Sequence, residues 1–174
     1  MKKIILTLAG IMALAFTSMD ASAQNGKVAL GLRATPDGGG FTAKFFTTPN
    51  WVIETQLNAG GLMGNGRGES FNAVALVEYH IYMPDPSWQI FFGMGMHAGV
   101  WDHNSRMYGG GDYYFNDRNT EGIFGFDGIG GVAYKFKKIP LSLSADMKPA
   151  VNVVEDPRFF SHNMFGISAR FHIN

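Results

Sequence analysis

Hydrophobic and polar residues alternate along most of this chain, and the alternation is clearest over residues 124–148. The apolar side chains of the first half share one parity, namely Phe124, Phe126, Val132, Tyr134 and Phe136. After residues 137–140 (Lys-Lys-Ile-Pro), the same alternation resumes with Leu141, Leu143, Ala145 and Met147. Successive side chains of a β-strand point to opposite faces, so this pattern predicts a hairpin of two antiparallel strands. One face of this hairpin is apolar, and the other is small, polar or charged.

The same period of two predicts six further strands and no convincing helix. The expected strands are 27–34, 41–46, 53–59, 71–81, 89–101 and 164–173. Gly, Pro, Asn and Asp cluster between them and predict turns at 36–40, 48–50 and 83–87. Longer loops are expected at 60–70, 102–121 and 149–162. With the hairpin, the chain contains eight predicted strands.

The lengths of the connections also follow a pattern. The links near 48–50, 82–88 and 137–140 are short, whereas those after the third, fifth and seventh strands are longer and rich in Gly and Asn. The link after the first strand, at 36–40, is a short exception. Bacterial outer-membrane barrels have an even number of strands, short periplasmic turns and longer outer loops. The pattern therefore favours an all-β fold: a single eight-stranded antiparallel up-and-down transmembrane β-barrel with both termini on the periplasmic side.

The first 23 residues differ from the rest and predict a secretory signal peptide. Lys2 and Lys3 precede an uncharged apolar stretch at 4–16, and residues 21–23 (Ala-Ser-Ala) form a small-residue cleavage site. The alternative is a transmembrane anchor, but the apolar stretch is shorter than the roughly 20 residues that a spanning helix needs. We therefore expect a signal peptide at 1–23 and one barrel domain at 24–174, exported to the outer membrane.

Composition excludes several classes of protein. The chain has no cysteine, so it is not a disulfide-stabilised scaffold. Its formal net charge is +0 and only 16% of its residues are charged, against about 25% in an average protein. No excess of positive charge attracts nucleic acid, which is not an expected partner.

Alternation alone does not decide which face of the barrel lies inside, because a soluble barrel has an apolar interior and a membrane barrel a polar one. The low charge favours the membrane, with outer-membrane lipid as a partner. Within the strands, the charges fall almost entirely on the polar parity: Arg33, Lys44, Glu54, Glu78, Asp127, Lys135, Asp146, Lys148 and Arg170. Aromatic residues gather at strand ends, as interfacial girdles require. They are Trp51, Tyr79, Tyr82, Trp88, Tyr134 and Phe136 at the short turns, and Trp101 and Tyr108 at the long loops.

Four stretches carry a family resemblance. They are DGIGGVAYKF at 127–136, the turn KKIP at 137–140, DMKP at 146–149 and GISARF at 166–171. In these the chain resembles the small eight-stranded outer-membrane β-barrel proteins of Gram-negative bacteria. The resemblance implies an outer-membrane location and a contact with the outer-membrane insertion machinery during assembly. Such proteins often end on an aromatic residue, whereas here Phe171 is followed by His172, Ile173 and Asn174.

The polar parity supplies the candidate functional residues. Eight strands leave an interior just wide enough for side chains to fill, so we do not expect an open diffusion pore. Buried charges need partners of the opposite sign. We therefore predict an ionic network in the lumen, formed by Arg33, Lys44, Glu54, Glu78, His80, His97, Asp127, Asp146, Lys148 and Arg170. The functional alternative is a narrow path for ions or protons along the same groups.

A lipid A-modifying enzyme is an alternative function, because small outer-membrane barrels include such enzymes. The candidates are Ser161 with His162 and Asp102 with His103, but neighbouring side chains on an extended chain point in opposite directions. Neither G-x-S-x-G nor H-E-x-x-H occurs. We expect no enzyme, no catalytic residue and no cofactor. A soluble lipocalin-like binder of a hydrophobic ligand is the remaining alternative, although its usual Gly-x-Trp is missing near the first strand.

The longest predicted loop holds the remaining candidates. Asp102, Asp112 and Asp117 match no calcium-binding spacing, so no metal site is expected. Exposed tyrosine among Gly, Ser and Asn makes an adaptable contact surface. We predict such a surface, for an extracellular ligand, at Tyr108, Tyr113, Tyr114 and Phe115.

Overall fold

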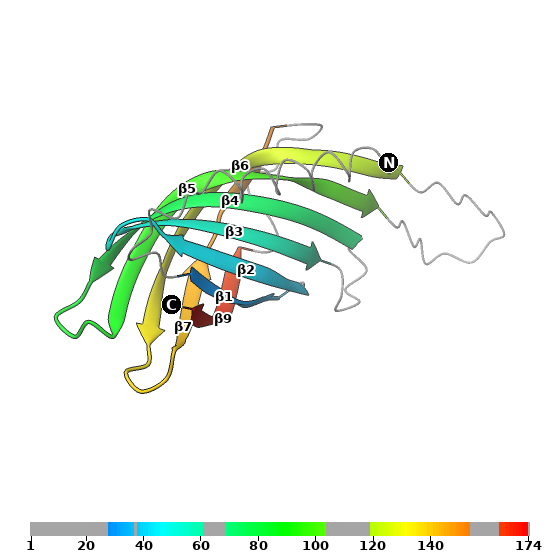
Figure 1. Ribbon diagram of the computed structural model, residues 1–174. Helices are drawn as coiled ribbons and strands as arrows, with labels where there is room; N and C mark the ends of the chain where they lie inside the picture. The colour runs from blue at the N-terminus through cyan, green and yellow to red at the C-terminus, as the bar shows by residue number, and fades with distance from the viewer. Residues whose placement is uncertain (1–27, 37, 61–68, 104–118, 154–163, 174) are drawn as a thin grey trace.

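The computed structural model describes residues 28–36, 38–60, 69–103, 119–153 and 164–173. They form one sheet of nine strands (Figure 1), and these ranges contain no helix long and apolar enough to cross a bilayer. The strands are β1 (Val28–Thr35), β2 (Gly38–Phe46), β3 (Trp51–Gly60), β4 (Glu69–Tyr82), β5 (Trp88–His103), β6 (Asn119–Lys135), β7 (Leu141–Met147), β8 (Ala150–Asn152) and β9 (Phe165–Ile173).

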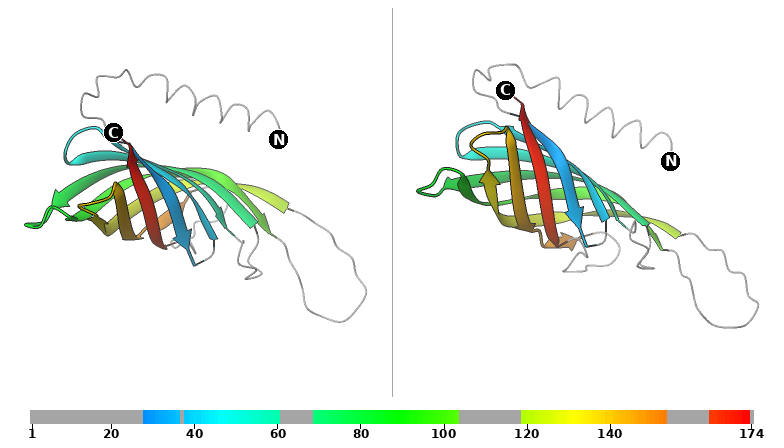
Figure 2. Two further views of the ribbon diagram at one scale, coloured as in Figure 1. Left: turned by 60° about the horizontal axis from the view of Figure 1, so that its bottom comes forward. Right: turned by 90° about the horizontal axis from the view of Figure 1, so that it is seen from below.

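The sheet closes on itself (Figure 2). Each strand from β1 to β6 pairs antiparallel with the next, and β9 pairs with both β1 and β7. Both β7 and β8 pair with β6, on successive stretches of that strand, so they share one position in the wall. The result is a closed antiparallel barrel with eight wall positions, which confirms the predicted fold.

The short strand β8 corrects the prediction that 149–162 is a loop. Pro149 has no backbone N–H to donate, so the ladder between β7 and β6 is interrupted there. Its carbonyl nevertheless accepts a hydrogen bond from the Gly128 N–H at 2.9 Å, and pairing resumes between Ala150 and Asp127. Because proline favours a turn, the sequence pattern predicted that the strand ends here, and its continuation as β8 was missed. The rest of this predicted loop, 154–163, lies outside the described residues.

Several other strand ends also extend further than predicted. The strand β2 already begins at Gly38, β5 runs to His103 and β6 begins at Asn119. A β-carbon added at Gly40 would lie 2.0 Å from the Leu57 carbonyl oxygen, so glycine permits the close approach of β2 to β3 rather than forming a turn. At the ends of β5 and β6 the side chains are polar. The hydrophobic pattern stops there, although backbone pairing continues to His103 and Asn119.

The connections at 47–50, 83–87 and 136–140 all lie at one end of the barrel, on the left in Figure 1. We call it the short-connection end. The first residue of β1, Val28, pairs with Ile173 near the end of β9, which places both chain ends of the barrel here. The predicted placement of both termini on the side of the short turns agrees with this arrangement.

The polar parity faces the interior and the apolar parity faces outward. Among the residues that the structure describes, eighteen polar or charged residues are buried, against seven apolar ones. Large apolar side chains are instead exposed on nearly every strand, with Phe41 at 69% and Met94 at 74%. This is the reverse of a soluble barrel, in which the apolar face fills the interior.

Candidate functional site

The structure places all ten residues of the predicted ionic network in the barrel interior. None of them is more than 6% exposed. Nine of them come from eight strands, and Lys148 lies between β7 and β8; together they form two separate groups of contacts. We call Lys44, Glu54, Glu78, His80 and Arg170 the lower group, because it lies nearer the short-connection end. The remaining five, Arg33, His97, Asp127, Asp146 and Lys148, are the upper group.

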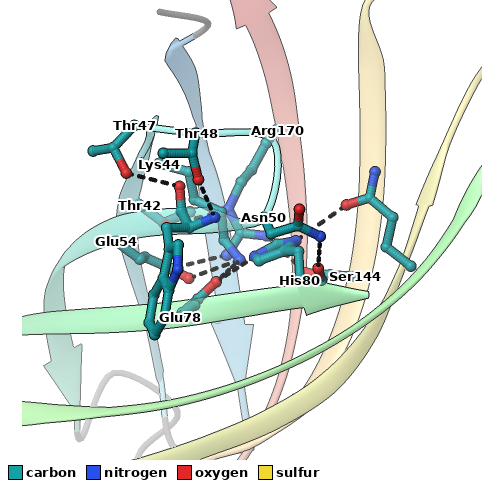
Figure 3. Close-up of polar contacts among 12 residues, drawn as sticks. Thr42, Lys44, Thr47, Thr48, Asn50, Glu54, Glu78, His80, Ser144 and Arg170 are labelled. Carbon is teal, nitrogen blue, oxygen red and sulfur yellow. Dashed lines mark hydrogen bonds and ion pairs between the residues drawn. The ribbon is translucent and has the colours of Figure 1, made fainter. Parts of the chain in front are cut away.

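Figure 3 shows the lower group, in which one lysine joins two carboxylates. Lys44 Nζ donates to Glu78 Oε2 at 2.6 Å and lies 3.1 Å from Glu54 Oε2. His80 Nε2 lies 2.8 Å from the same Glu78 oxygen, and its Nδ1 lies 3.1 Å from Gln89 Oε1. These contacts connect strands β2, β3, β4 and β5 across the lumen. The lower group therefore links these four neighbouring strands, which form half of the barrel wall.

Arg170 extends the lower group to β9 and uses three of its nitrogen atoms. Its Nη2 donates to Glu54 Oε1 at 2.7 Å, its Nη1 to Ser144 Oγ at 2.6 Å and its Nε to Thr42 Oγ1 at 3.2 Å. Glu54 Oε1 also accepts from Thr42 Oγ1 and from Gln56 Nε2. A buried ion pair is well compensated only when further hydrogen bonds satisfy the remaining polar atoms. The ion pair of Arg170 with Glu54 meets that condition at Arg170, because each of its three nitrogen atoms has an acceptor.

The upper group has two parts. Asp127 holds one part together, with His97 Nδ1 2.7 Å from its Oδ2 and Lys148 Nζ donating to its Oδ1 at 3.1 Å. Asn152 Oδ1 lies 2.7 Å from His97 Nε2, on the other side of the ring. The second part is the hydrogen-bonded ion pair of Arg33 with Asp146. The short strand β8, which the sequence did not predict, thus contributes Asn152 to this group.

Charge is balanced within each group. With neutral histidines, the lower group holds Lys44 and Arg170 against Glu54 and Glu78, and the upper group holds two cations against two carboxylates. Selective channels instead present rings of one sign of charge or of carbonyl oxygens. The balance indicates that, within each group, the positive and negative charges compensate one another.

A layer of apolar side chains lies in the interior on the side of β4, β5 and β6, and sequence reasoning missed it. Val74, Leu76, Phe91 and Ile129 form a buried cluster on β4, β5 and β6. Along β5, Phe91 lies between Gln89 and the upper-group residue His97, and along β6, Ile129 follows Asp127. All four residues occupy the polar parity, where their apolar character breaks the alternation. That break was the available signal.

Phe91 connects this layer to the lower group. Its ring stacks on His80 with centroids 5.3 Å apart, and Lys44 Nζ lies 4.1 Å from its centroid. The space for the ring depends on Gly131, because a β-carbon there would lie 2.6 Å from Phe91 Cζ. A glycine of β6 thus makes room for a bulky ring on β5.

On the outside, aromatic residues gather at the short-connection end. Trp51 contacts Tyr79 with ring centroids 5.1 Å apart, and Trp88 contacts Tyr134 at 4.9 Å. Tyr82 donates its hydroxyl to the Pro49 carbonyl at 2.9 Å. Aromatic rings with a polar edge suit the boundary between lipid and water. The side chains of Trp101 and Tyr108, predicted for the opposite girdle, lie outside the described residues.

The remaining candidates concern catalysis, metals and the long loop. Asp102 and His103 are consecutive on β5, and their side chains are not described. Ser161 and His162 lie outside the described residues, as does the predicted contact surface of Tyr108, Tyr113, Tyr114 and Phe115. No group of three or more potential metal ligands occurs in the described part of the chain. The loop surface therefore stays a prediction.

Comparisons with known proteins bear on the fold. No protein-family model and no curated protein matches the chain. Among solved structures it is similar to the crystal structure of the N-terminal β-barrel domain of Pseudomonas aeruginosa OprF, with a TM-score of 0.64 and 11% sequence identity. The match covers 86% of this chain and 98% of that domain. It confirms the predicted resemblance to small closed β-barrels at the level of the fold.

Proposed function

We propose that this protein is an integral outer-membrane β-barrel with a lumen filled by side chains, and that its role is structural or depends on contacts made by its long outer connections. The observation that carries the proposal is the inverted arrangement of its two faces. Soluble monomers rarely expose contiguous apolar patches larger than a few hundred Å². Here large apolar side chains are exposed around the barrel, whereas charged ones are buried. A lipid bilayer is the environment that favours such an apolar exterior.

The orientation follows from the same proposal. In bacterial outer-membrane barrels the short turns face the periplasm and the longer loops face outward. The short-connection end would then be periplasmic, in contact with the lipid headgroups through Trp51, Trp88 and their aromatic neighbours. The connections at 61–68, 104–118 and 154–163 would face the outside and present the predicted loop surface. The similarity of the fold to the OprF barrel domain supports this class of protein.

Membrane fractionation with heat-modifiability tests the proposal. We expect the mature protein in the outer-membrane fraction and a shift in gel mobility between unheated and boiled samples, because closed barrels resist unfolding by detergent. A barrel protein truncated before β9 is the control, since it cannot close and should show no shift. A protein that stays soluble in the periplasm without detergent would overturn the proposal and favour the lipocalin-like alternative.

The filled lumen leads to a separate prediction about conductance. The two balanced ionic groups and the layer around Phe91 occupy the interior, so we expect no steady single-channel steps when the protein is reconstituted in planar bilayers. An outer-membrane porin reconstituted in the same bilayer shows that the assay detects a pore. Reproducible steps that depend on the concentration of this protein would instead support the narrow path for ions or protons.

A further inference from the structure

The short strand β8 has little backbone pairing of its own. Within the described residues it pairs only with β6, over Gly125 to Asp127. Just after it, the Val153 N–H donates to the Phe124 carbonyl at 2.9 Å. A segment with few backbone contacts opens more easily than the rest of a fold. Side-chain contacts therefore decide much of how firmly β8 is held.

One side chain reaches β8 across the strand between them. His97, Gly125 and Asn152 lie opposite one another on β5, β6 and β8. Gly125 leaves the middle of this row open, because a β-carbon there would lie 2.7 Å from His97 Cε1. The ring passes over β6, and its Nε2 lies 2.7 Å from Asn152 Oδ1. This contact joins β5 to β8, which are not neighbours in the sheet.

Both ring nitrogens of His97 face an oxygen atom. Nδ1 lies 2.7 Å from Asp127 Oδ2, and Nε2 lies at the same distance from Asn152 Oδ1. A neutral imidazole carries one N–H, whereas the protonated ring carries two. Only the protonated ring donates to both oxygens. When it loses a proton, the remaining N–H stays with the carboxylate of Asp127, because a charged acceptor forms the stronger hydrogen bond.

The charges around His97 act in opposite directions. Asp127, on β6, attracts the proton, whereas Lys148, between β7 and β8, repels it while donating to the same carboxylate at 3.1 Å. The residue opposite on β4 is apolar. The other part of the upper group, Arg33 with Asp146, balances its own charge. Histidine is the side chain that changes its charge between about pH 5 and 8.

We propose that His97 is a pH-dependent latch for β8: its protonated ring holds Asn152 inside the barrel wall, and loss of the proton releases β8 from β5. The latch closes as the pH falls and opens as the pH rises through the titration of the ring. An Asn152 amide that turned over would instead donate its Nδ2 to a neutral ring, and that contact would be lost at low pH. The two arrangements predict opposite dependences on pH.

Amide hydrogen exchange of the mature protein in a nonionic detergent, followed by NMR at about pH 5 and about pH 8, tests the latch. Protection factors remove the intrinsic pH dependence of exchange. The probe is the Val153 N–H, which follows β8 directly. A hydrogen bond from a charged group contributes enough that we expect about tenfold greater protection at the lower pH. The ring-nitrogen chemical shifts of His97 report its protonation in the same samples.

Two variants that each remove one amide separate the latch from a general effect of pH. Asn152→Leu removes the acceptor on β8, and we expect it to lower the protection of Val153 at low pH to about its value at high pH. Gln89→Met is the matched control, because Gln89 Oε1 faces the other buried histidine, His80, at 3.1 Å in the lower part of the lumen. We expect the control to keep the wild-type pH dependence, and heat-modifiability verifies that each variant is folded.

Several results would overturn the latch. One is a protection of Val153 that is equal at both pH values, or greater at the higher pH, as a turned amide predicts. Another is a His97 ring that keeps one protonation state across the range. A third is a pH dependence that Asn152→Leu keeps, or that Gln89→Met loses to the same extent. None of these outcomes bears on whether the barrel lies in the outer membrane.

Discussion

Replacement of Arg170 with methionine is expected to lower the free energy of unfolding by about 3–5 kcal/mol, because loss of one partner leaves a buried charge uncompensated. Arg170 Nη2 donates to Glu54 Oε1, and its other nitrogens donate to Ser144 and Thr42. Glu54 is fully buried, so water does not replace the lost donor. Lys44 would remain as its only cationic partner among the described residues.

Urea unfolding in lipid vesicles, followed by tryptophan fluorescence, measures this effect. Lys137→Met is the matched control, because Lys137 also forms an ion pair, with Asp85 at 3.3 Å, but both side chains are exposed. Exposed pairs contribute about 0–1 kcal/mol, so the control should change little. Similar losses in the two variants would show that the lower group does not stabilise the barrel.

A double variant separates the pair from its surroundings. Glu54→Gln combined with Arg170→Met removes both charges, so we expect a loss smaller than the sum of the two single losses. The coupling should exceed about 0.5 kcal/mol, as it does for residues in one network. Additive losses would mean that Arg170 and Glu54 act independently, in contradiction to the contact between them.

The barrel could be predicted from the sequence because the features that define its strands and turns are local. Alternation in segments such as 124–136 and 141–147 depends only on the period of the strand, and turn residues mark where it stops. It did not decide which face lies inside, since the same alternation serves a soluble and a membrane barrel. The closed structure decides it, with Glu54 and Glu78 buried while Phe41 and Met94 are exposed.

The partners within the interior were beyond the reach of the sequence. Parity showed that Arg170 and Glu54 share the polar face, but their contact joins residues 116 positions apart across the lumen. Which charges meet depends on the register of every strand between them and on the tilt of the strands, and neither is local. The same holds for Arg33 and Asp146, which are 113 positions apart.

The apolar layer and β8 were missed for different reasons. The apolar layer occupies positions of the polar parity: Val74, Leu76, Phe91 and Ile129. An interpretation that gives each strand one apolar and one polar face does not predict apolar residues there. Pro149 is a strong signal for a turn, and it outweighed the parity that continues from Asp146 and Lys148 to Ala150 and Asn152. In both cases the exceptions to the pattern lie inside the lumen, next to the ionic groups.

The exterior is the place where a single charge should have its next largest effect. Met94 lies in the middle of β5, paired with Val77 and Gly128, and is 74% exposed. If this surface faces lipid, Met94→Arg should lower the free energy of unfolding by about 2–4 kcal/mol, as arginine does at the midplane of an outer-membrane barrel. To avoid this cost, the arginine side chain would have to extend along the barrel until its guanidinium reaches the lipid headgroups.

Met83→Arg is the matched control for this substitution. Met83 is also exposed, but it lies in the turn after β4, where an arginine meets water and headgroups, so we expect a change of about 0–1 kcal/mol. Urea unfolding of both variants in lipid vesicles gives the comparison. Equal and small effects at the two positions would show that residue 94 does not face hydrocarbon, and the exposed apolar band would then need a protein partner rather than a bilayer to cover it.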